Sequence, residues 1–106
     1  MRETIGQYIR TLRNDKGWTL TQLAAKLDLD SANLSKIENG KRELDEKKLS
    51  KLCKIFKLDK VEMEKELISE KIARTICDKE LDQSILILAK EKINYLKNGY
   101  NSLHND

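Results

Sequence analysis

Apolar residues recur three and four positions apart along most of the chain, which is the spacing of one face of an α-helix. Residues that favour helix starts interrupt this pattern at short intervals. Two of the interruptions, Thr4-Ile5-Gly6-Gln7 and Thr19-Leu20-Thr21-Gln22, have the capping-box sequence. The pattern therefore predicts a series of helices, with starts at Thr4, Thr19, Asp30 or Ser31, Asp45, Asp59 and Asp82.

One segment, SILILA at residues 84–89, has the composition of a β-strand. We favour a helix there, because Leu86, Ala89, Ile93 and Leu96 continue one helical stripe and the sequence offers no second strand to pair with it. The chain contains no Pro and only four Gly, so little in it interrupts helices. We expect an all-α fold.

Two of the expected helices, residues 19–27 and 31–39, are short and are joined by only a few residues, which is the helix-turn-helix layout. The turn requires a residue that tolerates positive φ, and Asp28 or Asp30 can supply it. Because such short helices are marginal alone, the flanking helices must share a core with them. The expected core consists of Ile9, Leu12, Trp18, Leu23, Leu27, Leu34, Ile37, Leu49, Leu52 and Phe56.

A charged pair is expected within this core. Glu38 is turned partly towards the Leu34 and Ile37 side of its helix, and a carboxylate there needs a cation or several hydrogen-bond donors. Arg13 follows the apolar face of the first helix and can bind a carboxylate with two parallel hydrogen bonds. We predict an Arg13–Glu38 ion pair; two independent surface charges are the alternative.

These residues together resemble the Cro/lambda-repressor-type (XRE) helix-turn-helix family. The resemblance rests on LTQLAAKLDLDSANLSKIENGKR and on IRTLRNDKGWT before it. It covers about residues 5–66 and implies a five-helix domain, so we assign residues 1–66 to a DNA-binding domain. In the family, the residues at the positions of Arg13 and Glu38 form an ion pair. Leu20 and Asp28 stand where the family usually has Gln and Gly, and the Leu20 side chain cannot make the phosphate contact of that Gln.

The outer face of residues 31–42 carries small polar side chains and almost no acid, which suits a DNA major groove. By resemblance, Lys36 is expected to read guanine, Ala32 a thymine methyl and Asn33 adenine, with Ser31 also facing the bases. Simple helix formation by Ala32 and an N-cap role for Ser31 are alternatives. The expected phosphate contacts come from Thr19, Thr21, Ser35, Asn39, Lys41 and Arg42.

The charge distribution agrees with a polyanionic partner for the first half. Residues 1–57 hold 13 Lys and Arg against 8 Asp and Glu, a net charge of 13 − 8 = +5. Residues 58–106 hold 8 and 10, a net charge of 8 − 10 = −2. We expect double-stranded DNA as the partner of the basic half.

Residues 67–106 carry more apolar side chains than one neighbouring helix can bury. Surplus apolar surface of this kind indicates a partner subunit, so we expect a two-fold homodimer that binds a palindromic operator. Folding back onto the first domain is the alternative. The expected interface residues are Ile72, Ile76, Ile85, Leu88, Ile93 and Leu96.

Other classes of function have little support in the sequence. No nucleophile–base set, phosphate-binding Gly loop or metal-ligand cluster is present, so we expect no enzyme activity, cofactor, metal or small-molecule ligand. No apolar run approaches membrane-span length, and Cys53 and Cys77 are interpreted as core thiols of a cytoplasmic protein. A transcriptional regulator, such as a restriction–modification controller or a small repressor, is the leading hypothesis. An antitoxin whose last helices bind a toxin is the alternative.

Overall fold

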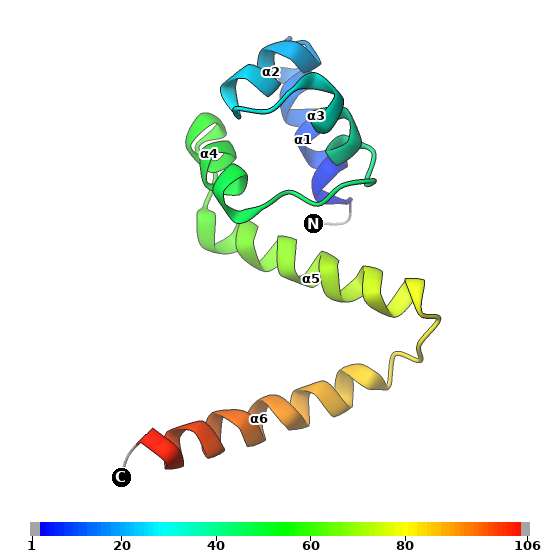
Figure 1. Ribbon diagram of the computed structural model, residues 1–106, viewed down its shortest axis with the longest axis vertical. Helices are drawn as coiled ribbons and strands as arrows, with labels where there is room; N and C mark the ends of the chain where they lie inside the picture. Colours follow the sequence, from blue (N-terminus) through cyan, green and yellow to red (C-terminus); the bar gives the residue numbers. More distant parts are fainter. Residues whose placement is uncertain (1–2, 105–106) are drawn as a thin grey trace. The chain divides into compact units, whose positions relative to one another are not determined.

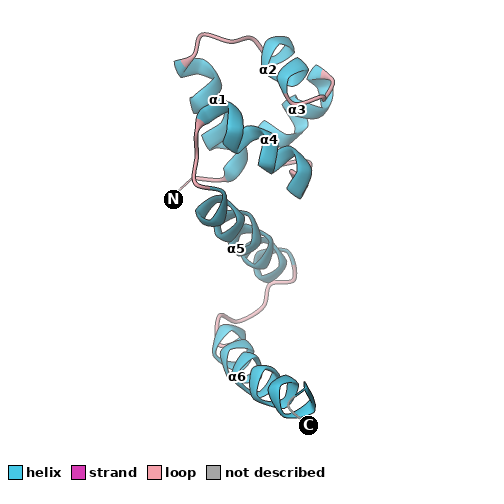
Figure 2. Ribbon diagram, turned by 90° about the vertical axis from the view of Figure 1, so that its left-hand side faces the viewer, coloured by secondary structure: helices cyan, strands magenta, loops and turns pink. Residues whose placement is uncertain are grey.

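The computed structural model describes the backbone of residues 3–104 and the side chains of residues 3–99. This part of the chain contains helices and loops but no strand, which confirms the all-α prediction (Figure 2). The strand-like segment at residues 84–89 lies at the start of a helix. The helices, labelled in Figure 1, are α1 (Ile5–Asp15), α2 (Leu20–Lys26), α3 (Ser31–Glu38), α4 (Glu46–Phe56), α5 (Lys60–Asp78) and α6 (Ile85–His104).

Polar side chains begin the first four helices. Thr4 Oγ1 accepts a hydrogen bond from the Gln7 amide at 3.1 Å, and Gln7 Oε1 accepts one from the Thr4 amide at 3.0 Å, which completes a capping box. Thr19 and Gln22 form the same arrangement at the start of α2. Asp30, rather than Ser31, is the N-cap of α3, and Asp45 is the N-cap of α4. These caps satisfy amides that a helix start leaves without intrahelical partners.

The N-terminal core joins α1 to α5. Leu12, Trp18 and Phe56 were expected inside this core but are partly exposed. Trp18 and Phe56 pack against its edge, with their ring centroids 5.5 Å apart. The expected core also omitted Ile5, Ala24, Met63 and Leu67, which lie on helices. It omitted Leu44 too, which precedes α4 in a loop and therefore has no helical spacing to reveal it. The buried apolar residues are Ile5, Ile9, Leu23, Ala24, Leu27, Leu34, Ile37, Leu44, Leu49, Leu52, Cys53, Met63 and Leu67.

Gly6 allows α1 to approach α3 closely. A Cβ atom at Gly6 would lie 2.2 Å from the Ile37 carbonyl oxygen and 2.8 Å from that of Glu38. Both are backbone atoms that cannot rotate away, so only glycine fits without a shift of one helix.

The chain divides into two compact units, Met1–Lys71 and Ile72–Asp106, with the division inside α5. The boundary assigned from sequence lies before residue 67. In the second unit, every side chain of α6 from Ile85 to Asn98 is exposed. Cys77 is also exposed, whereas Cys53 is buried in the first unit. The interpretation of Cys77 as a core thiol was therefore wrong.

Candidate nucleic-acid interface

α2 and α3 are joined by a tight turn at Asp28, which has φ of 54°. Of the two aspartates that the sequence left open for this role, Asp28 takes the left-handed conformation. The Leu29 amide donates to the Ala24 carbonyl oxygen at 2.9 Å and closes the turn. Asp30 is the N-cap of α3, so only Leu29 separates the turn residue Asp28 from the start of the second helix.

Two lysines of α4 bind this turn. Lys48 Nζ donates to the Asp28 carbonyl oxygen at 3.1 Å, and Lys51 Nζ forms an ion pair with the Asp28 carboxylate. The hydrogen bond and charge of Lys51 lower the pKa of the Asp28 carboxyl group. Lys48 and Lys51 therefore fix the turn between α2 and α3 on α4.

α3 has one buried and one exposed face. Leu34, Ile37 and Glu38 are buried, with Glu38 only 2% exposed. Opposite them, the side chains of Ser31, Ala32 and Lys36 are exposed, and those of Asn33 and Ser35 are half-buried. The exposed face is small and polar, as the sequence pattern indicated.

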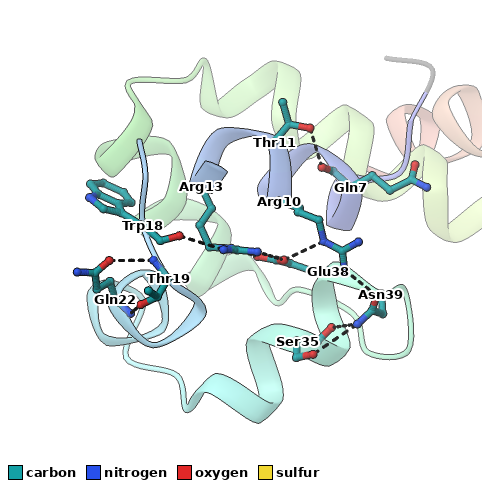
Figure 3. A network of polar contacts seen from close by, with 10 residues as sticks. All are labelled: Gln7, Arg10, Thr11, Arg13, Trp18, Thr19, Gln22, Ser35, Glu38 and Asn39. Atoms are coloured by element: carbon teal, nitrogen blue, oxygen red, sulfur yellow. Dashed lines mark hydrogen bonds and ion pairs between the residues drawn. The ribbon is translucent and has the colours of Figure 1, made fainter. Parts of the chain in front are cut away.

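Glu38 is held by the Arg13 guanidinium (Figure 3). Arg13 Nε donates to Glu38 Oε2 at 2.8 Å, and Arg13 Nη2 donates to Glu38 Oε1 at 3.0 Å. Arg13 Nη1 also donates to the Trp18 carbonyl oxygen at 2.9 Å. The hydrogen bond to Glu38 raises the pKa of Arg13. This pair joins α1, α3 and the segment before α2 at one point.

Arg10 is a second cation at the same carboxylate, and the sequence analysis missed it. Its Nε donates to Glu38 Oε1 at 3.2 Å and its Nη2 to Asn39 Oδ1 at 2.6 Å. Asn39 Nδ2 donates in turn to the Ser35 carbonyl oxygen at 2.9 Å. Arg10 lies three residues before Arg13, so its position on the same helical face was the available signal. Two guanidiniums around one carboxylate leave a net positive charge beside Asn39 and Ser35 (Figure 3).

The remaining residues expected at phosphates lie around the ends of α2 and α3. Thr19 and Thr21 are exposed, although the Thr19 hydroxyl already caps α2. Lys41 is exposed in the loop after α3, and its amide donates to the Lys36 carbonyl oxygen at 2.8 Å. Arg42 is also exposed, but its Nη1 donates to Asn33 Oδ1 at 2.6 Å. Asn33 and Arg42, expected to contact different parts of DNA, thus contact each other.

The residues expected at a dimer interface lie in the second unit. Ile76 is half-buried, whereas Ile72, Ile85, Leu88 and Ile93 are exposed. The sixth, Leu96, is 65% exposed. None of the helices in the described part of the chain has the length and apolar character that crossing a bilayer requires.

A family model described as helix-turn-helix matches residues 9–63, which is more than half of the chain. The chain belongs to the XRE-type helix-turn-helix family. This confirms the family recognised from the sequence. The matched region contains α2, the Asp28 turn and α3, and is a DNA-binding domain of the kind found in transcriptional regulators.

Two relatives agree with this family. The HTH-type transcriptional repressor RghR of Bacillus subtilis (strain 168) is 39% identical over 57 residues, which cover 50% of this chain and 42% of that protein. This helix-turn-helix chain therefore matches less than half the length of that relative. The clp gene regulator ClgR of Corynebacterium glutamicum is 26% identical and superimposes with a TM-score of 0.50, covering 67% of this chain and 84% of ClgR.

Proposed function

We propose that this protein is a sequence-specific transcriptional regulator that inserts α3 into the major groove of an operator. The observation that carries the proposal is the division of α3 into a sealed inner face and an exposed outer face without acid. The Arg13–Glu38 pair and Gly6 fix the inner face on α1. The outer face therefore has a fixed orientation and is free to contact base edges.

Ser31, Ala32 and Lys36 are the proposed base-facing residues of α3. Lys36 has the donor that guanine O6 and N7 accept, and Ala32 offers a methyl group of the size that packs beside the thymine methyl. Ser31 does not cap α3, since Asp30 does, so its hydroxyl is available to a base. These contacts would supply sequence preference.

Phosphate contacts are proposed on both sides of α3. Thr19 and Thr21 lie at the start of α2, and Lys41 lies in the loop after α3. Ser35 and Asn39 lie beside the surplus positive charge of Arg10. Such contacts set the position of the domain on the duplex and make affinity depend on salt.

We also propose that the protein acts as a homodimer through Ile72, Ile76, Ile85, Leu88, Ile93 and Leu96. The exposure of α6 supports this, because a helix with so many uncovered aliphatic side chains is stable when a partner covers them. Two copies of α3 about 34 Å apart would meet successive major grooves, which favours an inverted-repeat operator. A restriction–modification controller or a small repressor has this organisation by resemblance.

The test is selection of bound sites from random double-stranded DNA, with the mass of each complex measured in solution. We expect an inverted repeat bound by two copies. Lys36→Ala should weaken operator binding by about 1–3 kcal/mol and relax the preference at one base pair per half-site. Lys65→Ala is the control, since Lys65 is an exposed α5 lysine outside the proposed surface.

Two outcomes would contradict parts of this proposal. An asymmetric single half-site would exclude the dimeric operator. Equal weakening on operator and random DNA would show that Lys36 contacts phosphate. Recovery of the protein only as a stable complex with a different protein would instead support an antitoxin, in which the exposed α6 side chains bind that partner.

A further inference from the structure

A chain of three polar side chains connects the start of α3 with the loop that follows it. The Asp30 carboxylate accepts one hydrogen bond from the backbone N–H of Asn33 at 2.7 Å and another from the side-chain Nδ2 of Asn33 at 3.0 Å. Asn33 Oδ1 accepts the hydrogen bond from Arg42 Nη1 at 2.6 Å. The two charged partners fix the orientation of the Asn33 side-chain amide. The Asp30 carboxylate can only accept, so it faces Nδ2, and the Arg42 guanidinium can only donate, so it faces Oδ1.

This arrangement occupies the group with which Asn33 would read a base. An asparagine that reads adenine uses Oδ1 and Nδ2 together, on N6 and N7 of the base. In Asn33 both atoms already have charged partners, which hold the side-chain amide in one orientation and leave one N–H and one lone pair for any base. The side chain is also half-buried. Asn33 is thus better suited to hold Arg42 than to contact DNA.

Arg42 is left with a free donor edge beside the exposed face of α3. Its Nη1 contacts Asn33, and within the described residues no other acceptor binds its guanidinium. Asn33 and Lys36 are three residues apart on α3 and therefore neighbours on its surface. The Arg42 side chain, although it comes from a loop, therefore contacts a residue that neighbours Lys36 on the surface of α3.

We propose that Arg42 reads a guanine next to the base pair read by Lys36, and that Asn33 is its positioning residue. The proposal rests on the proposed function of α3. Arg42 Nε and Nη2 present two parallel N–H groups, which match guanine O6 and N7. Asn33 restricts the long Arg42 side chain before DNA arrives, so less conformational entropy is lost on binding. These roles differ from those expected from sequence, which were a phosphate contact for Arg42 and an adenine contact for Asn33.

The experiment compares sites selected from random duplex DNA by the full-length wild type, Arg42→Lys, Asn33→Ala and the double variant. Arg42→Lys keeps the charge but loses the planar pair of donors. We expect it to lose the guanine preference at one position per half-site and to bind the selected operator about 5- to 150-fold more weakly. The preference at the Lys36 position should persist. Lys41→Ala is the matched control and should weaken operator and random DNA alike.

Asn33→Ala should reduce the same guanine preference by less than Arg42→Lys does, and should change no preference once Arg42 is Lys. A separate loss of adenine preference in Asn33→Ala would overturn the positioning role. Retention of all base preferences in Arg42→Lys would overturn base reading by Arg42. If the wild type enriches no sequence, the proposed function fails and this inference fails with it. Melting followed by circular dichroism shows that each variant is folded.

Discussion

The unit Met1–Lys71 and helix α6 use their apolar residues in opposite ways. In the first unit, aliphatic side chains from five helices are almost fully buried, and its one buried charge, within the described residues, is paired. In α6, Leu88 and Ile93 are each 52% exposed and Leu96 is 65% exposed. The two regions are similar in helix content but not in how their helices are stabilised.

This difference indicates where each region obtains its stability. Burying one Leu or Ile side chain contributes about 1.5–3 kcal/mol, and the first unit obtains that contribution from its own core. The exposed residues of α6 obtain little of it within one chain. Stability of the first unit should therefore be independent of protein concentration, whereas order in α6 should depend on a partner.

The comparison is tested most severely by removing the buried carboxylate. Glu38→Ala leaves Arg13, whose side chain is 13% exposed, without its charged partner. Loss of one member of a buried ion pair costs about 3–5 kcal/mol, so the first unit should lose much of its free energy of unfolding. Urea unfolding followed by Trp18 fluorescence measures this change.

Glu43→Ala is the matched control. Glu43 pairs with Lys71 at 3.7 Å, but its side chain is 64% exposed. An exposed pair contributes at most about 1 kcal/mol, so this variant should unfold almost like the wild type. Equal effects of the two substitutions would mean that the Glu38 network behaves as surface charge in solution.

Two glycine substitutions should have opposite signs in the two regions. At Gly6, a methyl group would collide with the Ile37 and Glu38 carbonyl oxygens, and overpacking of this kind costs roughly 1–3 kcal/mol or more. At Gly99 of α6, nothing lies within 4 Å of the added Cβ. Gly99→Ala should therefore stabilise α6, because a helix favours Ala over Gly by up to about 1 kcal/mol. Thermal melts of both variants give the signs, and stabilisation by Gly6→Ala would refute the close contact of α1 with α3.

Local rules accounted for most of the fold, because the elements of the first unit are determined by short segments. Capping boxes gave the starts of α1 and α2, and helical spacing gave most of the core. Leu44 and Gly6 were missed because their roles depend on residues outside their own short segments. Leu44 packs from a loop, and the role of Gly6 depends on a backbone 31 residues later, Ile37. The spacing of apolar residues along a helix reveals neither of these roles.

The candidate interface shows the same limit. The exposure of Ala32 and Lys36 follows from their position opposite Leu34 and Ile37, so the sequence could predict it. The Arg42–Asn33 and Arg10–Asn39 hydrogen bonds join residues from different segments. Side chains that long can reach several partners, and only the folded backbone selects one. The sequence could therefore identify the polar residues but not their partners.

A charge on α6 should affect assembly while leaving the first unit unchanged. Leu88→Lys places an ammonium group at the proposed interface, where two copies would repel and lose apolar contact. The free energy of unfolding of residues 1–71 should change by less than about 0.5 kcal/mol, as is typical of exposed positions. Sedimentation should show monomers in place of dimers, with weaker operator binding.

Asn94→Lys is the control for this prediction. Asn94 is exposed on α6 and lies opposite Ile85 and Leu96 by helical periodicity. It should leave the dimer intact. If Asn94→Lys dissociates the protein and Leu88→Lys does not, the interface involves another face of α6.

The two cysteines provide the mildest test, because they can be labelled in the wild-type protein without any substitution. Cys53 is buried in the first unit, where burial raises the pKa of its thiol, and Cys77 is exposed at the end of α5. Since the thiolate is the reactive form, a raised pKa leaves less of it at neutral pH and moves its reaction to more alkaline solution. A thiol reagent at neutral pH should modify Cys77 first and Cys53 only as the first unit opens. Mass spectrometry of the partly labelled protein gives the order, and in urea the two rates should converge once the first unit is fully unfolded. Rapid labelling of Cys53 in native protein would show that this core opens easily, and the contrast between the two regions would then be one of degree.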